Sequence, residues 1–264
     1  MPEEVSPFIK FAYLGGGDGF VSKLSRLSQI AEPENWYYNS PNAKNDDQRQ
    51  NGVLFQYIHH TFARAQDEGE ILEENNCALM NTGLFTPNGE EIFAYFTPNR
   101  LYGIRPDSER WYLDSFLKES SHRVPENARS NMPEYVDYFA DKPQGMYFDA
   151  NLRILINRDH IIDDNFDRLP DTIKAFPLDV IKTLFSAAET IMQKRISRNN
   201  RLVIPQYYNK KIAYLAPLKI ANEVIPLAIE KNEGTYRVNT IFTNGMAYCN
   251  ARLLMKPESN WLTN

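Results

Sequence analysis

The sequence is poor in cysteine and has no long apolar segment, and both absences restrict the class of protein. Its 264 residues include two cysteines, Cys77 and Cys249, without the Cys-x-x-Cys spacing of many zinc sites. We therefore expect neither a disulfide scaffold nor a structural zinc site. No apolar run approaches the roughly 20 residues that a helix needs to cross a bilayer. The acidic start MPEEVSPFIK also lacks the apolar core of a secretory signal, so the sequence predicts a cytoplasmic protein.

Several motifs of catalysis and ligand binding are missing as well. No Gly-x-Ser-x-Gly segment, which presents the nucleophile of many serine hydrolases, occurs. The glycine cluster GGGDGF (15–20) lacks the Lys-Ser/Thr ending of a phosphate-binding loop and is interpreted as a turn. His59 and His60 are neighbours that would point about 100° apart on a helix, so we interpret them as surface or interface residues rather than as ligands of one metal ion. The net charge of −5 argues against indiscriminate nucleic-acid binding but permits a local basic patch.

The N-terminal half is predicted to contain a helix and a hairpin. Apolar residues recur at helical spacing over 53–66, and Gly69 follows as a stop. Residues 78–99 indicate two strands around a Pro-Asn-Gly turn. The polar stretch 40–52 is predicted to be an exposed linker, and 106–145 to wrap the surface without regular structure.

The C-terminal half is predicted to be a mainly antiparallel sheet covered by one long helix. Residues 146–157 indicate a strand, 177–197 the long helix, and 201–243 four strands separated by turns. Strands joined by tight turns with one covering helix give an α+β fold. We expect domains at 1–145 and 146–264, with a single domain as the alternative.

The segment NRDHIIDDNFDR (157–168) concentrates acidic residues where a strand ends. If a helix begins there, His160 and Asp164 lie one turn apart on one face, a spacing suited to acid–base catalysis. Asp163 and Asp167 are further candidate oxygen ligands for a metal ion.

The same residues also permit a purely structural interpretation. Acidic side chains near a helix N-terminus accept backbone N–H groups and favour the helix dipole. In that case Arg168 is expected to bridge to Asp164 at i,i+4.

A basic segment, KRISRNNRLVIPQYYNKK (194–211), contains six Lys or Arg residues and no acid. Arg198 is a candidate phosphate ligand, Tyr207 and Tyr208 are candidates for stacking on bases, and Gln206 for contacting a base edge. This mixture of cations and aromatics suits single-stranded RNA or a nucleotide. Basic residues at a helix C-terminus are also favourable for the helix dipole alone.

The segment GMAYCNARLL (245–254) supplies the last candidates, Asn250 and Arg252. Together they suit a phosphate or carboxylate. An ion pair between Arg252 and an aspartate near 163–167 is the alternative.

Several stretches resemble a known family. They are FAY (11–13), LSQIAEPENWYY (27–38), MNTGLFTPNGEEIFAYF (80–96), NRDHIIDDNFDRLP (157–170), VIPQYY (203–208), YRVNTIFTNGMAYCNARLL (236–254) and SNWL (259–262). Over nearly its whole length the chain resembles the family catalogued as domain of unknown function 3825. The resemblance implies no activity, although relatives joined to nucleic-acid-binding modules associate the family with RNA. The chain departs from the family pattern at two positions. Phe166 stands where a tryptophan is expected, and Asn244 where an aspartate is expected. Asn244 would weaken a metal site.

The leading hypothesis is one pocket that binds a phosphate-bearing ligand, RNA or a nucleotide. Its residues are His160, Asp164, Arg198, Gln206, Tyr207, Tyr208, Asn250 and Arg252. With His160 as acid–base group and Asp164 orienting it, the pocket would be a phosphoesterase or nuclease, with Mg²⁺ or Mn²⁺ as candidate cofactor. The alternative is a non-catalytic protein-interaction module that uses the plentiful aromatic residues as its surface.

Overall fold

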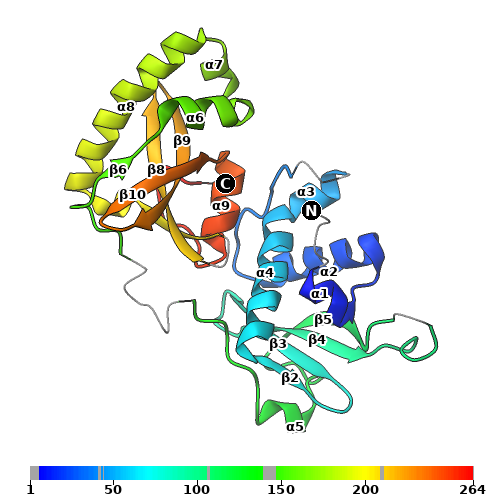
Figure 1. Ribbon diagram of the computed structural model, residues 1–264. Helices are drawn as coiled ribbons and strands as arrows, with labels where there is room; N and C mark the ends of the chain where they lie inside the picture. The colour runs from blue at the N-terminus through cyan, green and yellow to red at the C-terminus, as the bar shows by residue number, and fades with distance from the viewer. Residues whose placement is uncertain are drawn as a thin grey trace. The chain divides into compact units, whose positions relative to one another are not determined.

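The chain divides into two compact units (Figure 1). The computed structural model describes residues 6–40, 43, 45–105, 108–138, 147–208 and 211–263. Contacts between Cα atoms group the chain into Met1–Asp137 and Tyr138–Asn264, here called unit 1 and unit 2. The domain boundary predicted between 145 and 146 falls outside the described residues.

Unit 1 is built on a five-stranded sheet in the order β1-β5-β4-β3-β2. The strands are β1 Ala12–Tyr13, β2 Ile71–Glu73, β3 Ala78–Phe85, β4 Glu91–Pro98 and β5 Trp111–Lys118. β3 and β4 form the predicted hairpin, with Gly89 in its turn at φ 81°. β5 corrects the prediction for 106–145, since it pairs with both β4 and β1. β5 lies opposite a register shift between Tyr95 and Phe96 of β4. Its buried and exposed residues therefore do not alternate regularly along the strand.

The helices of unit 1 are α1 Pro7–Phe11, α2 Gly16–Ile30, α3 Asp46–Gln50, α4 Gly52–Glu68 and α5 Glu126–Arg129. Of these helices, α1, α2 and α4 contact this sheet. α4 is the predicted helix, and Gly69 ends it in a left-handed conformation with φ 78°. The glycine cluster is only partly a turn, because α2 begins inside it at Gly16. The stretch 40–52, predicted to be an exposed linker, contains the short helix α3.

Aromatic side chains fill the core between these helices and the sheet. Phe8 of α1 stacks on Phe62 of α4 at 4.6 Å between ring centroids and meets Phe96 of β4 edge-on at 6.1 Å. Phe11 stacks on Trp111 of β5 at 6.4 Å. Much of the aromatic content therefore contributes apolar packing inside unit 1.

Unit 2 contains the predicted mainly antiparallel sheet, in the order β6-β10-β9-β8-β7. Its strands are β6 Ile154–Leu155, β7 Ile204–Tyr208, β8 Lys211–Ile220, β9 Glu223–Asn232 and β10 Thr235–Ile241. Only β6 and β10 pair in parallel among the described strands of this sheet. β7 pairs with β8 only as far as Leu215, so the second half of β8 has a free edge within the described part of the chain.

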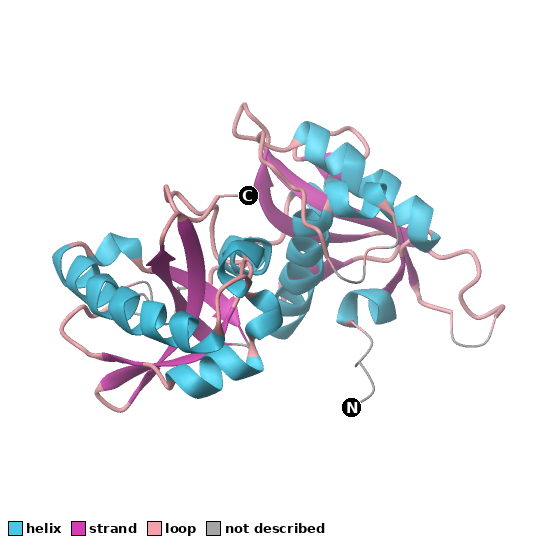
Figure 2. Ribbon diagram, turned by 90° about the horizontal axis from the view of Figure 1, so that it is seen from above, coloured by secondary structure: helices cyan, strands magenta, loops and turns pink. Residues whose placement is uncertain are grey.

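The helices of unit 2 cover both faces of its sheet (Figures 1 and 2). They are α6 Arg158–Asp164, α7 Asp171–Lys174, α8 Leu178–Arg198 and α9 Asn244–Arg252, with short 3-10 turns at Phe166–Arg168 and Asn200–Leu202. α8, the predicted long helix, packs on β8 and shares a core with Tyr214, Ala216 and Leu218. α9 contacts β7 and β9 instead. Together the units confirm the predicted α+β class. Throughout the described residues, no helix has the length and apolar character to cross a membrane.

Candidate phosphate-binding groove

The acidic segment forms α6 and places its histidine as predicted. His160 Nδ1 lies 3.0 Å from Asp164 Oδ2, one helical turn away, and both side chains are more than half exposed. Lys182 of α8 lies 2.6 Å from Asp159 and 3.9 Å from Asp163. The hydrogen bond from Lys182 lowers the pKa of Asp159 below its ordinary value. The acids of α6 are thus engaged in local pairs.

Arg168 corrects the predicted bridge to Asp164. Its guanidinium donates to Asn165 Oδ1 at 3.0 Å, Thr240 Oγ1 at 2.8 Å and the carbonyl of Ile241 at 3.0 Å. These bonds fasten the turn after α6 to the end of β10, which is a structural role.

The predicted metal ligands, Asp163 and Asp167, do not belong to a group of side chains that could hold a metal ion within the described residues. Within the described ranges, no group of three or more His, Cys, Asp or Glu side chains is arranged to hold a metal ion. Asp163 faces Lys182 at 3.9 Å, and the backbone carbonyl of Asp167 accepts a bond from Lys174 at 3.5 Å.

Gln206 and Tyr208 belong to the sheet face that α9 covers. Gln206 pairs with Ala213, so it points away from the face on which Tyr214 meets α8. It is fully buried, its Nε2 donates to the carbonyl of Tyr214 at 3.3 Å, and its Oε1 has no partner in the described residues. Tyr208 meets the ring of Phe242 edge-on at 5.7 Å.

The remaining candidates divide between the two faces. Asn250 is half-buried and Arg252 is 9% exposed, both on α9. Tyr207, one position after Gln206, points to the opposite face, where its ring meets Tyr138 at 4.8 Å.

The structure does not bring the predicted site residues into one pocket. α6 pairs with the first half of α8 through Lys182, whereas Arg198 is the last residue of that helix. At ~1.5 Å of rise per residue, Lys182 and Arg198 lie about 24 Å apart along the axis. Asn250 and Arg252 belong to the helix on the other face of the sheet.

Two adjoining hollows follow the C-terminal half of α8, and we call them together the α8 groove. The first, about 380 Å³, lies between α8, the free edge of β8 and the C-terminal tail. The second, about 390 Å³, lies around the last turns of α8. Both include Ile191, Arg195 and Leu202 in their walls. Of the predicted site residues, Arg198 lines this groove.

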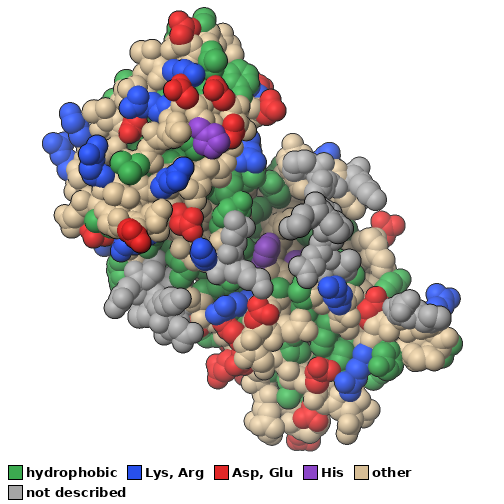
Figure 3. Space-filling model, viewed as in Figure 1, with side chains coloured by type: hydrophobic (Ala, Val, Ile, Leu, Met, Phe, Trp, Pro, Cys, Tyr) green, Lys and Arg blue, Asp and Glu red, His purple; other side chains and the backbone are tan. Residues whose placement is uncertain are grey.

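Four cationic side chains line the α8 groove and form no ion pair with a carboxylate of the described residues. Lys194, Arg195 and Arg198 line the second hollow, and Arg195 and Lys219 line the first. None of these four lies within ion-pair distance of an acid in the described part of the chain. In contrast, Lys182 near the start of α8 is held by acids. Figure 3 shows blue side chains gathered at the left edge of unit 2, over the C-terminal end of α8.

The first hollow also contains an aromatic ring and amides that the sequence hypotheses did not select. Trp261 lines it, with Nε1 donating to the carbonyl of Leu202 at 2.8 Å. Asn222, Asn244 and Asn260 add neutral hydrogen-bonding groups. The groove thus combines cations, an aromatic face and amides, the groups that contact phosphates, base faces and base edges.

Comparison with known proteins places the chain in a family. The model of the family described as domain of unknown function (DUF3825) matches residues 27–261. The chain belongs to the DUF3825 family. Neither the curated proteins nor the solved structures contain a match to it.

The DUF3825 match covers every residue that lines the α8 groove and ends at Trp261. The segment SNWL (259–262) is one of the stretches that resemble the family, so its tryptophan, Trp261, was the sequence feature that could have pointed to this side of the groove. Asn244, where the resemblance implies an aspartate, lies at the first hollow. An amide at this position adds no negative charge opposite Arg195 and Lys219, so it does not oppose an anionic ligand.

Proposed function

We propose that unit 2 binds a phosphate-bearing ligand, with single-stranded RNA as the ligand class, in the α8 groove. The observation that carries the proposal is the set of cations without carboxylate partners that lines a concave surface. Lys194, Arg195, Arg198 and Lys219 supply positive charge, and none of them lies within ion-pair distance of an acid in the described part of the chain. One carboxylate, that of Glu223, also lines the first hollow and accepts a hydrogen bond from Thr172 at 2.9 Å. Phosphates that replace counterions at such a surface gain free energy from counterion release.

Trp261 supports single-stranded RNA over a bare phosphate. Stacking of a base on an aromatic side chain is worth about 1–3 kcal/mol and requires no particular base. The neighbouring asparagine amides offer donors and acceptors to a base edge. A ligand with phosphates and unpaired bases would use all three kinds of group at once.

The predicted nuclease chemistry of His160 and Asp164 remains a separate prediction. Their side chains are exposed on α6 and lie toward the other end of α8 from Arg198. The proposal of binding therefore does not depend on them. The protein-interaction alternative loses part of its motivation, because many aromatic rings pack in the core of unit 1.

The test is fluorescence anisotropy of a labelled single-stranded RNA titrated with the full chain at low salt. We expect Arg195→Ala to weaken binding about tenfold, since Arg195 contacts both hollows and one charged contact is worth about 1.5 kcal/mol. Lys182→Ala is the matched control, because this cation is on the same helix but is paired with Asp159. It should bind like the wild type.

A second pair of variants tests the stacking role. Trp261→Ala should lose about five- to 150-fold in affinity, and Trp261→Phe should retain most of the wild-type affinity because a phenyl ring still stacks. Inorganic phosphate should compete only weakly. Equal affinity of the wild type, Arg195→Ala and Trp261→Ala for RNA would refute the proposed groove.

A further inference from the structure

A third hollow lies on the other side of α8 from the first one. It has a volume of about 290 Å³ and lies between the C-terminal half of α8 and residues 148–154, which lead into β6. In Figure 1 this segment lies beside the C-terminal end of α8. α8 lines the first hollow with Arg195 and the third with Gln193 and Ser197. At about 100° per residue, Gln193 and Ser197 each point about 160° away from Arg195 around the helix axis.

The three hollows adjoin one another around the end of α8. The second hollow shares Ile191, Arg195 and Leu202 with the first, and it shares Lys194 with the third. Arg198 also lines the second hollow, and the side chains of Lys194, Arg195 and Arg198 are all exposed. A path from the first hollow to the third over the exposed face of α8 therefore crosses these three cations.

The third hollow is positively charged. Arg153 and Lys194 line it, and none of its described lining residues is an acid. Neither cation lies within ion-pair distance of a carboxylate in the described part of the chain. Asp149, in the turn before Arg153, accepts hydrogen bonds at Oδ1 from the backbone N–H and Nδ2 of Asn151 at 3.0 and 2.9 Å. The carboxylate of this turn is thus occupied, and an anionic group in the hollow would meet two cations.

The backbone around Arg153 is fixed, whereas its side chain is not engaged. The carbonyl of Arg153 accepts a hydrogen bond from the backbone N–H of Tyr236 at 2.8 Å. Gln193 Nε2 of α8 donates to the carbonyl of the next residue, Ile154, at 3.2 Å. The guanidinium of Arg153 is exposed and has no hydrogen-bond or ion-pair partner among the described residues. The fold therefore holds this cation at the hollow without using it in packing.

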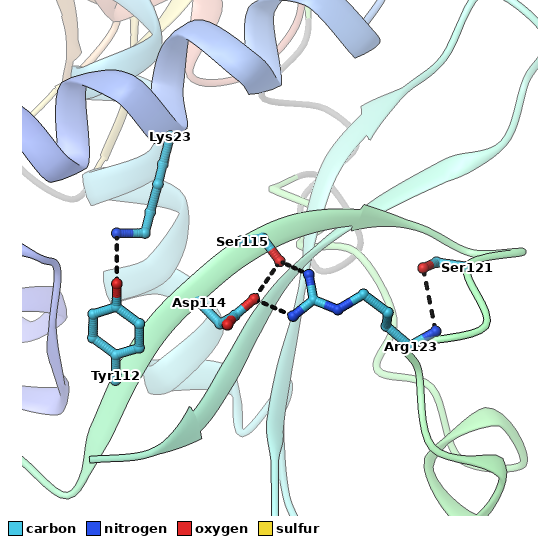
Figure 4. Close-up of polar contacts among 6 residues, drawn as sticks. All are labelled: Lys23, Tyr112, Asp114, Ser115, Ser121 and Arg123. Carbon is cyan, nitrogen blue, oxygen red and sulfur yellow. Dashed lines mark hydrogen bonds and ion pairs between the residues drawn. The ribbon is translucent and has the colours of Figure 1, made fainter. Parts of the chain in front are cut away.

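Cations with a structural role are bonded to neighbouring side chains instead. In unit 1, Lys23 donates to Tyr112 Oη at 3.3 Å (Figure 4). In the same view, Arg123 pairs with Asp114 and donates to Ser115 Oγ at 3.0 Å. The arginine of the third hollow has no such bonds in the described part of the chain, so its charge is available to a ligand.

We propose that the bound RNA strand continues from the α8 groove over the last turns of α8 into the third hollow, where Arg153 and Lys194 contact its phosphates. The proposal rests on RNA binding by the α8 groove and specifies the ligand of that groove further. An α-helix with its side chains is about 10–12 Å across, so roughly this distance separates the first hollow from the third. A mononucleotide can place its phosphate group in one hollow only, whereas a strand presents a phosphate at every nucleotide. The ligand is therefore an RNA strand that crosses α8 and not a mononucleotide.

The test compares two labelled single-stranded RNAs of mixed sequence, about three and about twelve nucleotides long, because single-stranded sites cover about 4–16 nucleotides. Fluorescence anisotropy of each RNA is measured with the full chain at several salt concentrations. Arg153→Ala should weaken binding of the longer RNA about tenfold and make its salt slope shallower by about 0.7. The shorter RNA should bind this variant like the wild type, since it occupies the α8 groove, where Trp261 and more of the cations lie.

Two further variants separate a direct contact from a general effect of charge. Arg153→Lys keeps the positive charge and should retain most of the affinity for the longer RNA. Arg237→Ala removes an exposed arginine of β10, the strand next to β6, and should bind both RNAs like the wild type. The side chain of Arg237 points to the opposite face of the sheet from Tyr236, which belongs to the core beneath α8. Because Arg153 and Arg237 are exposed, all these variants should keep the wild-type melting temperature.

The outcomes distinguish failure of this inference from failure of RNA binding itself. If the wild type binds neither RNA, both proposals are refuted. If the wild type binds both RNAs and Arg195→Ala weakens both, but Arg153→Ala leaves the affinity and salt slope of the longer RNA unchanged, the strand does not enter the third hollow. Equal weakening of both RNAs by Arg153→Ala would also refute the inference, because a contact outside the α8 groove should not affect an RNA confined to it.

Discussion

Lowering the pH should destabilise unit 1 through protonation of His59, beginning at a pH above the range in which most carboxylates are protonated. Burial lowers the pKa of this imidazole to about 4, against 6.5 ordinarily. The unfolded chain therefore takes up a proton at higher pH than the folded chain does. The stability contributed by neutral His59 is fully present above pH 6.5 and is lost as the pH falls toward 4.

The size of this loss follows from proton linkage. Within that window each pH unit removes about 1.4 kcal/mol from the free energy of unfolding. Between pH 6.5 and pH 4.5 the loss from His59 alone is about 2 kcal/mol, a large share of the usual stability of a small domain.

Urea unfolding followed by tryptophan emission measures this effect in unit 1. Trp36 and Trp111 lie in unit 1, so Trp261→Phe removes the only signal from unit 2. In this background, His59→Phe should lose about 2 kcal/mol less than the parent between pH 6.5 and pH 4.5. His122→Gln, at an exposed histidine of unit 1, should follow the parent. Parallel pH profiles for the parent and His59→Phe would refute the buried neutral imidazole.

Three further changes test other parts of the structure. Gly83→Ala should lower the free energy of unfolding by about 1–2 kcal/mol in urea titrations, because φ is 67° and the new Cβ would lie 2.9 Å from Tyr57 Oη; an unchanged midpoint would contradict this. Arg168→Ala should cost about 1–3 kcal/mol by losing its three bonds to the turn and to β10, whereas Arg168→Lys should recover only part. Cys77 and Cys249 should react with a disulfide reagent at pH 8 only after denaturation, since burial raises both thiol pKa values, that of Cys249 to about 12. Rapid labelling of the native chain would show that they are accessible.

The sequence predicted the elements whose periodicity is regular. α4, α8 and the β3–β4 hairpin have clear apolar spacing and clear stop or turn residues, and all three occur where expected. β5 was not predicted because its sequence lacks the regular alternation of apolar and polar residues that indicates a strand. The alternation of buried residues is interrupted where β5 lies opposite the register shift in β4. Gly16–Phe20 did not look helical because glycine disfavours helices, yet tertiary packing overrides that preference.

The candidate site was harder to predict because it depends on contacts between distant segments. The His160–Asp164 pair follows from helical spacing alone, and the structure has it at 3.0 Å. The partly buried position of His59, predicted to be at the surface or at an interface, depends on rings from α1 and α2 that no local pattern places there. The α8 groove likewise joins Arg195 to Trp261 through the free edge of β8, a feature of strand pairing rather than of composition.

RNA binding across a range of salt concentrations tests the central proposal most directly. The logarithm of the association constant should fall linearly with the logarithm of salt, with a slope of about −0.7 for each phosphate contacted. Four contacts by the groove cations imply a slope of about −2.8 for the wild type and about −1.4 for an Arg195→Ala/Arg198→Ala double variant. Lys182→Ala should keep the wild-type slope. A wild-type slope near zero, or the same slope in the double variant, would contradict RNA binding in the α8 groove.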